Sequence, residues 1–65
     1  MKIIVLHDRY SNDPVIVRPD AIVMMQKCKD DKGEYSNIVV GTITMDVKET
    51  IGTVMTKIKK AESEE

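Results

Sequence analysis

The spacing of apolar residues changes near residue 47 of the chain. Between residues 42 and 47 apolar and polar side chains alternate, with Ile43, Met45 and Val47 on one face of an extended segment. Beyond it the apolar residues recur every three or four positions, at 47, 51, 54, 55 and 58. A period of two is typical of a half-buried strand, and a period near 3.6 of an amphipathic helix. The change therefore predicts a strand that ends near Val47 and leads into a C-terminal helix.

The predicted helix has a capping residue and a cationic end. Thr50 precedes it, and a threonine hydroxyl can accept a backbone N–H of the first turn. Lys57 and Lys60 lie near its C-terminal end, which carries a partial negative charge. Gly52 costs about 1 kcal/mol relative to alanine, so the helix needs packing against the rest of the fold. Residues 61–65, AESEE, are expected to form a disordered acidic tail.

Two short strands and a loop are predicted before residue 20. The run KIIVL at 2–6 is rich in β-branched side chains and predicts a strand that ends near His7. Residues 7–14, HDRYSNDP, are dense in turn-forming residues and lead to a second strand at 15–17. Pro19 has no backbone N–H, so it belongs in a bend or at a strand edge.

The segment AIVMMQKCK, residues 21–29, is ambiguous between strand and helix. As a strand it places Ile22, Met24 and Cys28 on one face. As a helix it groups Ile22 with Met25 and the polar Gln26, which makes a poorer apolar stripe. We favour the strand, because the segment is apolar on both faces near its start and a cluster of turn-forming residues follows it.

Two further turns divide the second half of the predicted sheet. Residues 30–37, DDKGEYSN, are interpreted as a turn with Gly33 in a left-handed conformation. Residues 37–47 form two strands around Gly41, because a glycine permits the positive φ of a tight hairpin. Together these elements predict an α+β fold: a small antiparallel sheet of about five short strands, a meander or half-barrel, followed by one C-terminal amphipathic helix. Residues 1–60 form a single domain in this interpretation.

Composition limits the core that this chain can build. It has 65 residues, no tryptophan or phenylalanine, and a single cysteine, Cys28. No disulfide can form within one copy, and a core of Ile, Val, Met and Leu in so short a chain is marginal. Four methionines on apolar stripes are expected to fill it: Met24, Met25, Met45 and Met55. We expect self-association, with a homodimer favoured, to complete this core.

Charge and hydropathy argue against several classes of function. Ten basic and eleven acidic residues give a net charge of −1, whereas a dedicated nucleic-acid binder has a basic excess. The N-terminal apolar run is too short for a signal peptide. No stretch approaches the ~20 apolar residues of a membrane span. With its lone thiol, the chain is expected to be cytoplasmic.

Few residues are candidates for chemistry. His7 is the only histidine, and neither it nor Cys28 has a catalytic partner fixed by spacing. The acidic residues of DDKGEYSN lack the register of a calcium loop. Tyr10 and Tyr35 fall in predicted loops, where they could form part of a partner surface. The sequence therefore assigns no catalytic, cofactor-binding or metal-binding residue.

Three segments carry a resemblance to a known family: VIVRPDAIVMM at 15–25, NIVVGTITMDVKET at 37–50 and IGTVMTKIKK at 51–60. They contain a Pro-Asp-x-Ile step at 19–22, the hairpin glycine Gly41, and a Val-x-Glu-Thr step at 47–50. In these features, and over most of its length, the chain resembles the FlbD family of small flagellar proteins, also called the SwrD swarming motility family.

The resemblance implies a small cytoplasmic accessory protein that acts through contacts, without catalytic residues or cofactors. The chain departs from the family pattern at two places. Its first hairpin loop is longer and lacks glycine, and Gly52 and Thr53 stand where the family helix tends to open with acidic residues.

Three functional hypotheses follow. The leading one is a small non-enzymatic interaction protein, linked to motility by the resemblance alone, which self-associates through an edge strand or leftover apolar surface. The alternative is a small β-barrel-like RNA-binding regulator with a basic strip formed by Arg18, Lys27 and Lys29. Near-neutral charge and sparse aromatic residues count against it. An enzyme would depend on His7 and Cys28 alone.

Overall fold

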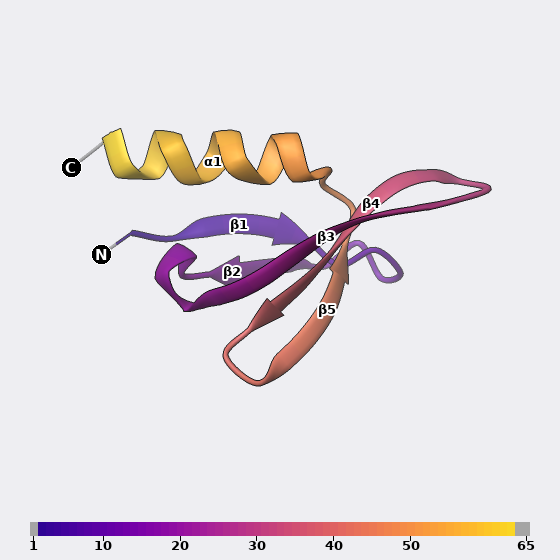
Figure 1. Ribbon diagram of the computed structural model, residues 1–65, viewed down its shortest axis with the longest axis horizontal. Coiled ribbons are helices and arrows are strands. Elements are labelled where there is room, and N and C mark those ends of the chain that lie inside the picture. The colour runs from indigo at the N-terminus through magenta and orange to yellow at the C-terminus, as the bar shows by residue number, and fades with distance from the viewer. Residues whose placement is uncertain (1, 64–65) are drawn as a thin grey trace.

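The first two strands form a hairpin in the computed structural model, which describes residues 2–63 (Figure 1). They are β1 (Ile4–His7) and β2 (Pro14–Val17), which pair antiparallel. Ile4 lies opposite Val17, and Leu6 lies opposite Val15. These four side chains share one face, because alternate residues of a strand point to the same side. The predicted hairpin is confirmed.

The other three strands form an antiparallel sheet in the order β3-β4-β5. They are β3 (Ile22–Asp30), β4 (Gly33–Val40) and β5 (Ile43–Val47), and a short 3₁₀ helix (Pro19–Ala21) precedes them. The ambiguous segment 21–29 is therefore almost entirely strand, as favoured, and Pro19 opens a bend. Gly41 has a φ of 61° in the two-residue turn between β4 and β5, as predicted.

The turn between β3 and β4 is much shorter than predicted. Only Asp31 and Lys32 form it, and β4 runs on from Gly33 through Tyr35. Gly33 has a φ of 123°, which costs a glycine little, and a two-residue turn therefore suffices. The polar residues after the turn join β4 because they pair with β3, where Cys28 lies opposite Tyr35. The polar residues at 33–37 therefore form part of a strand and not a loop.

A β-bulge in β3 changes which of its residues share a face. The register against β4 shifts between Ile22 and Met24, which leaves Val23 as an extra residue. Ile22 and Met25 consequently pack against the core, whereas Met24 lies on the opposite face with Cys28. The predicted grouping of Ile22 with Met24 and Cys28 is wrong because the bulge interrupts the period of two.

Helix α1 (Ile51–Ser63) follows β5 and lies alongside β1 (Figure 1). The predicted cap is confirmed, since the hydroxyl of Thr50 accepts the N–H of Thr53 at 3.3 Å. Val54 is fully buried, and Ile58 packs against the core. The helix therefore covers the core with the apolar stripe that the spacing predicted.

The C-terminal end of α1 differs from the expected tail, because the helix continues to Ser63. Ala61 packs against the core, and the hydroxyl of Ser63 donates to the C=O of Lys60 at 2.9 Å. Both contacts favour the helical conformation of this last turn. The rest of the predicted tail, residues 64–65, lies outside the described residues.

The two sheets meet where the chain leaves β1. Asp8 forms an antiparallel bridge with Val47, and the N–H of Arg9 donates to the C=O of Asp46 at 3.0 Å. The first strand thus continues briefly along the last one. The single sheet expected from the sequence is two antiparallel sheets with a common junction, and the α+β fold with five strands and a C-terminal helix is confirmed.

The core between the sheets and α1 is small. Its buried apolar residues are Ile4, Leu6, Val17, Ile38, Val47 and Val54. Met25 and Met45 pack against it, as expected. Met24 and Met55 are instead 50% and 53% exposed, so the expectation that they fill the core is wrong. The bulge turns Met24 outward, and Met55 lies at the margin of the helical stripe.

Candidate functional site

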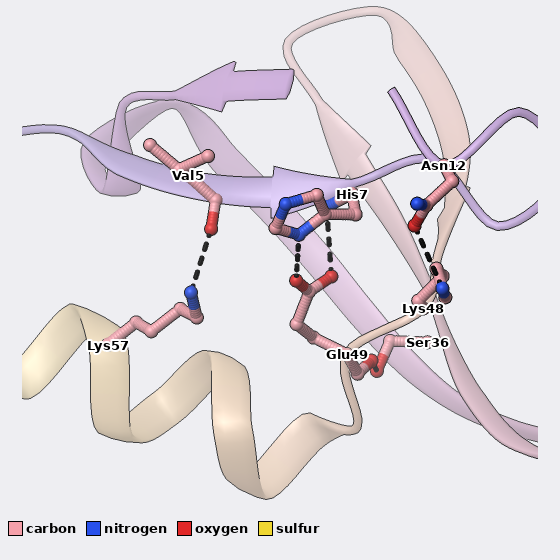
Figure 2. Close-up of polar contacts among 7 residues, drawn as sticks. All are labelled: Val5, His7, Asn12, Ser36, Lys48, Glu49 and Lys57. Atoms are coloured by element: carbon pink, nitrogen blue, oxygen red, sulfur yellow. Dashed lines mark hydrogen bonds and ion pairs between the residues drawn. The ribbon is translucent and has the colours of Figure 1, made fainter. Parts of the chain in front are cut away.

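The edge of β1 that does not pair with β2 faces the start of α1. There the backbone N–H of His7 donates to Oε1 of Glu49 at 2.9 Å, and Nδ1 of His7 lies 2.7 Å from Oε2 (Figure 2). One carboxylate therefore binds both the main chain and the side chain of the same residue. The contact joins β1 to the residue before the helix cap, 42 positions along the chain.

Three more polar contacts complete this junction. The N–H of Lys48 donates to the carbonyl of the histidine at 2.9 Å. Nζ of Lys57 donates to the carbonyl of Val5 at 3.0 Å (Figure 2). The hydroxyl of Ser36, which is fully buried, donates to the carbonyl of the glutamate at 2.7 Å. The contacts from Lys48, Lys57 and Glu49 occupy the free edge of β1, which would otherwise be open to another strand.

Burial and hydrogen bonding act in opposite directions on Glu49. Only 10% of its side chain is exposed, and burial by itself raises the pKa of a carboxyl group. The hydrogen bonds from the side chain and backbone of His7 outweigh burial, so the pKa of Glu49 lies below its ordinary value. The carboxylate is charged at neutral pH, and its contact with His7 is an ion pair whenever the imidazole is protonated.

An open depression lies beside this pair, lined by His7, Asn12, Lys48, Glu49, Thr50 and Thr53. A carboxylate that orients a histidine is one part of a general-base arrangement. The contacts of His7 in this junction are structural ones, since its backbone N–H and Nδ1 both bind Glu49 and its carbonyl accepts from the N–H of Lys48. The sequence predicted an ordinary polar residue at the end of a strand, and the geometry adds a structural contact between β1 and the segment before α1.

The loop between β1 and β2 is fastened to the face of the three-stranded sheet that points away from the core. Nη2 of Arg9 lies 2.5 Å from Oδ2 of Asp30, and its guanidinium stacks on the ring of Tyr35 at 3.8 Å from the centroid. Only 12% of the Arg9 side chain is exposed. The hydrogen bond from Arg9 lowers the pKa of Asp30. Arg9 thereby holds the loop across β3 and β4.

Asp46 supplies a second attachment for the same loop. Nδ2 of Asn37 donates to its Oδ1 at 2.8 Å, and the hydroxyl of Tyr10 donates to its Oδ2 at 2.7 Å. The hydrogen bond from Asn37 and then the one from Tyr10 lower the pKa of Asp46. Tyr10 lies in a loop, as predicted, and remains 78% exposed. Its hydroxyl is bound while most of its ring stays on the surface.

The remaining candidates for chemistry lie in a strand or in ion pairs that support the fold. Cys28 is half-buried, as expected, in the second half of β3. Of the acidic residues near the turn, Asp30 binds Arg9, and Glu34 lies 3.6 Å from Lys27. In the part of the chain that the structure describes, no group of three or more His, Cys, Asp or Glu side chains could hold a metal ion.

Two of the three residues of the predicted basic strip are paired with acidic residues. Nη2 of Arg18 lies 3.0 Å from Oδ2 of Asp20, and Lys27 is paired with Glu34. Lys29 shares a face of β3 with Lys27. The acidic partners offset the positive charge with which a nucleic-acid groove would neutralise phosphates.

Large apolar side chains remain on the surface. Eight are exposed among the described residues: Ile3, Val5, Tyr10, Ile16, Val23, Met24, Ile43 and Met55. Val5 and Ile16 lie opposite each other on the outer face of the β1–β2 hairpin. Val23 and Met24 follow one another at the start of β3. The sequence predicted some leftover apolar surface. The alternation of apolar and polar residues could not locate it at the start of β3, because the bulge at Val23 changes which side chains face outward.

Comparison of the chain with protein-family models, curated proteins and solved structures gives no match. Within residues 2–63, no helix combines the length and the apolar character that crossing a membrane requires. The functional interpretation therefore depends on the contacts and surfaces described above.

Proposed function

We propose that this chain is a small non-enzymatic accessory protein that self-associates as a homodimer and acts by binding another protein. Its resemblance to the FlbD family adds the proposal of a cytoplasmic setting and a link to motility. The observation that carries the proposal is the distribution of apolar side chains. Six are buried in the core, whereas eight large ones are exposed among the described residues.

The extent of the surface supports the same proposal. The accessible surface area is 4562 Å², whereas a compact monomer of 7.4 kDa exposes about 4,200 Å². The radius of gyration is 11.4 Å, against roughly 10.7 Å for a compact domain of 65 residues. An elongated chain with so small a core gains stability when a partner covers its apolar side chains.

The hydrogen bonds of Glu49 with His7 and of Arg9 with Asp30 favour a structural role for these residues. The Glu49 carboxylate binds His7, which holds β1 against the start of α1. Arg9 and Asp30 hold the first loop on the sheet. These groups support the shape of the molecule, and the exposed apolar surface is what remains for binding.

Sedimentation equilibrium over a wide concentration range tests the self-association. We expect the average mass to rise from 7.4 kDa toward twice that value. A mass that stays at the monomer value at every concentration overturns this part of the proposal. Circular dichroism of the same samples establishes that the chain is folded.

Affinity capture with the tagged chain tests the partner. Flagellar or motor proteins that are retained stoichiometrically at high salt support the motility-linked role. Recovery of the chain alone overturns the binding of another protein. Retained RNA that is lost as the salt concentration rises favours instead the RNA-binding regulator, because contacts to phosphate weaken steeply with salt.

A further inference from the structure

The longest strand, β3, has one edge that no other strand covers. It spans Ile22–Asp30, nine residues, and pairs with β4 on one side only. The order β3-β4-β5 leaves its second side at the margin of the sheet. Unpaired backbone groups along such an edge readily accept another strand.

The other strand edges are occupied or short. Glu49 and Lys57 occupy the free edge of β1. The backbone N–H groups of Arg9 and Lys48 join the end of β5 to the end of β1. Strand β2 has four residues and begins with Pro14, which has no N–H to donate. Among the described strands, β3 therefore offers the most extended site for pairing.

We propose that two copies of the chain pair through β3, antiparallel and centred on Gln26, to form one six-stranded sheet. This inference rests on the proposed function, which it deepens by naming the dimer surface. Gln26 is the middle residue of β3, and pairing about it places residues 24–28 of both copies, which lie beyond the bulge, in one regular ladder. Each copy contributes its three-stranded sheet, β3-β4-β5, to the joint sheet.

The backbone of β3 is oriented for this pairing. Its two-residue turn makes Asp30 and Gly33 a hydrogen-bonded pair, and such pairs alternate along an antiparallel ladder. The N–H and C=O groups of Met25, Lys27 and Lys29 consequently point away from β4. In the proposed register Met25 faces the partner's Lys27, and the two residues exchange both of their outward hydrogen bonds.

Charge and the bulge together select this register over its neighbours. A register centred on Met25 keeps the lysines apart, but it places Lys27 opposite the partner's Val23, the extra residue of the bulge, and so shortens the regular ladder. A register centred on Lys27 places that lysine opposite the same residue of the second copy. A register centred on Cys28 places Lys27 opposite the partner's Lys29. Like charges directly opposite each other destabilise a strand pair. Pairing about Gln26 avoids both contacts, because an apolar residue, the partner's Met25, then faces Lys27.

The same register brings exposed apolar groups together. Met24, which is 50% exposed, comes opposite the partner's Cys28, which is half-buried. Val23, which is 70% exposed at the bulge, lies at the margin of the new contact. The pairing therefore covers apolar surface that the folded monomer leaves in water, which favours association.

Cysteine cross-linking tests the interface and its register. In Gln26→Cys/Cys28→Ser, the two new thiols face each other across the axis, with Cα atoms about 4.5 Å apart. This separation suits a disulfide, so mild oxidation is expected to give a covalent dimer. In Met24→Cys, the new thiol faces the partner's Cys28, and a mixed disulfide between positions 24 and 28 is expected. Peptide mapping identifies the linked positions.

Matched controls separate the register from random oxidation. Met24→Cys/Cys28→Ser keeps the new thiol but removes its predicted partner, and it is expected to stay monomeric on a non-reducing gel. Lys27→Pro removes an N–H that points toward the second copy and leaves the β4 ladder intact, so it is expected to be a folded monomer. Lys27→Ala keeps that N–H and is expected to remain a dimer.

The outcomes distinguish this interface from self-association in general. Covalent dimers of the two cross-linking variants, absent from the control, support pairing about Gln26. A dimer by sedimentation that forms neither disulfide overturns the β3 interface and leaves self-association intact. Equal cross-linking of the control overturns the register. A wild-type chain that is monomeric at every concentration overturns the interface together with the proposed self-association.

Discussion

Glu49 binds His7 through both carboxylate oxygens, one to the backbone N–H and one to Nδ1 of the imidazole. The first contact satisfies a donor at the open edge of β1, and the second fixes the orientation of the ring. The fully buried Ser36 hydroxyl donates to the backbone carbonyl of Glu49, so both the main chain and the side chain of Glu49 are held in place. Glu49 therefore connects the N-terminal hairpin to the segment that leads into α1.

Replacing Glu49 is expected to destabilise the fold. Glu49→Ala leaves the His7 N–H without its partner and should lower the free energy of unfolding by about 2 kcal/mol. Glu49→Gln keeps a carbonyl acceptor and should lose less. Urea denaturation measures both. Asp31→Asn, in the exposed turn, is the control and should change stability by less than about 0.5 kcal/mol. A loss for Glu49→Ala as small as that of the control would contradict the structural role.

Glu49 should also make stability depend on pH. Its pKa in the folded chain lies below the ordinary value of 4.5, so the folded state binds this proton less tightly than the unfolded state. The stabilisation is fully present above about pH 5.5 and is lost progressively as the pH falls below 4.5. The stability difference between wild type and Glu49→Gln should therefore shrink in acid. Denaturation curves at neutral and acidic pH check this, and a constant difference would argue against it.

Two isoleucines in the sheets provide a matched test of the core. Ile38 in β4 is fully buried, so Ile38→Ala should cost about 2–5 kcal/mol and unfold much of this marginal chain. Ile16 in β2 is 68% exposed, and Ile16→Ala should change stability by less than about 0.5 kcal/mol. Thermal unfolding followed by circular dichroism compares them. Similar losses for the two variants would mean that Ile38 does not anchor the core.

The glycines are expected to respond in opposite directions. Gly52 lies in α1, and an added Cβ would meet no heavy atom nearer than Oγ1 of Thr50 at 4.0 Å. Gly52→Ala should therefore stabilise the chain by about 0.5–1 kcal/mol. Gly41 has a φ of 61°, and Gly41→Ala should destabilise by roughly 1 kcal/mol. Melting temperatures give the sign of each change. A lower melting temperature for Gly52→Ala would contradict the open space that the structure shows around this glycine.

Local features of the fold were predictable from the sequence. The change of period at Val47, the glycine turn at Gly41 and the Thr50 cap each depend on neighbouring residues, and each is confirmed. The turn at 30–37 was overestimated because polar residues that pair in a sheet have the composition of a loop. Nothing in the local pattern marks Val23 as the extra residue of a bulge.

The polar contacts that shape the candidate site were beyond prediction for a different reason. His7 and Glu49 are separated by 42 positions, and Arg9 and Asp30 by 21. Each pairing depends on how the two sheets and the helix are placed in space, which periodicity does not specify. In the sequence, Glu49 is marked only by its place in the Val-x-Glu-Thr step of the family resemblance.

The contact between Lys57 and Val5 spans 52 positions, whereas β3, β4 and β5 are connected by two-residue turns. Closing a long loop costs more chain entropy than closing a hairpin, so the three-stranded sheet is expected to form first. The N-terminal hairpin and α1 are then expected to pack against each other in a later step. During synthesis, the edge of β1 is therefore expected to stay unpaired until Glu49 and α1 have been made.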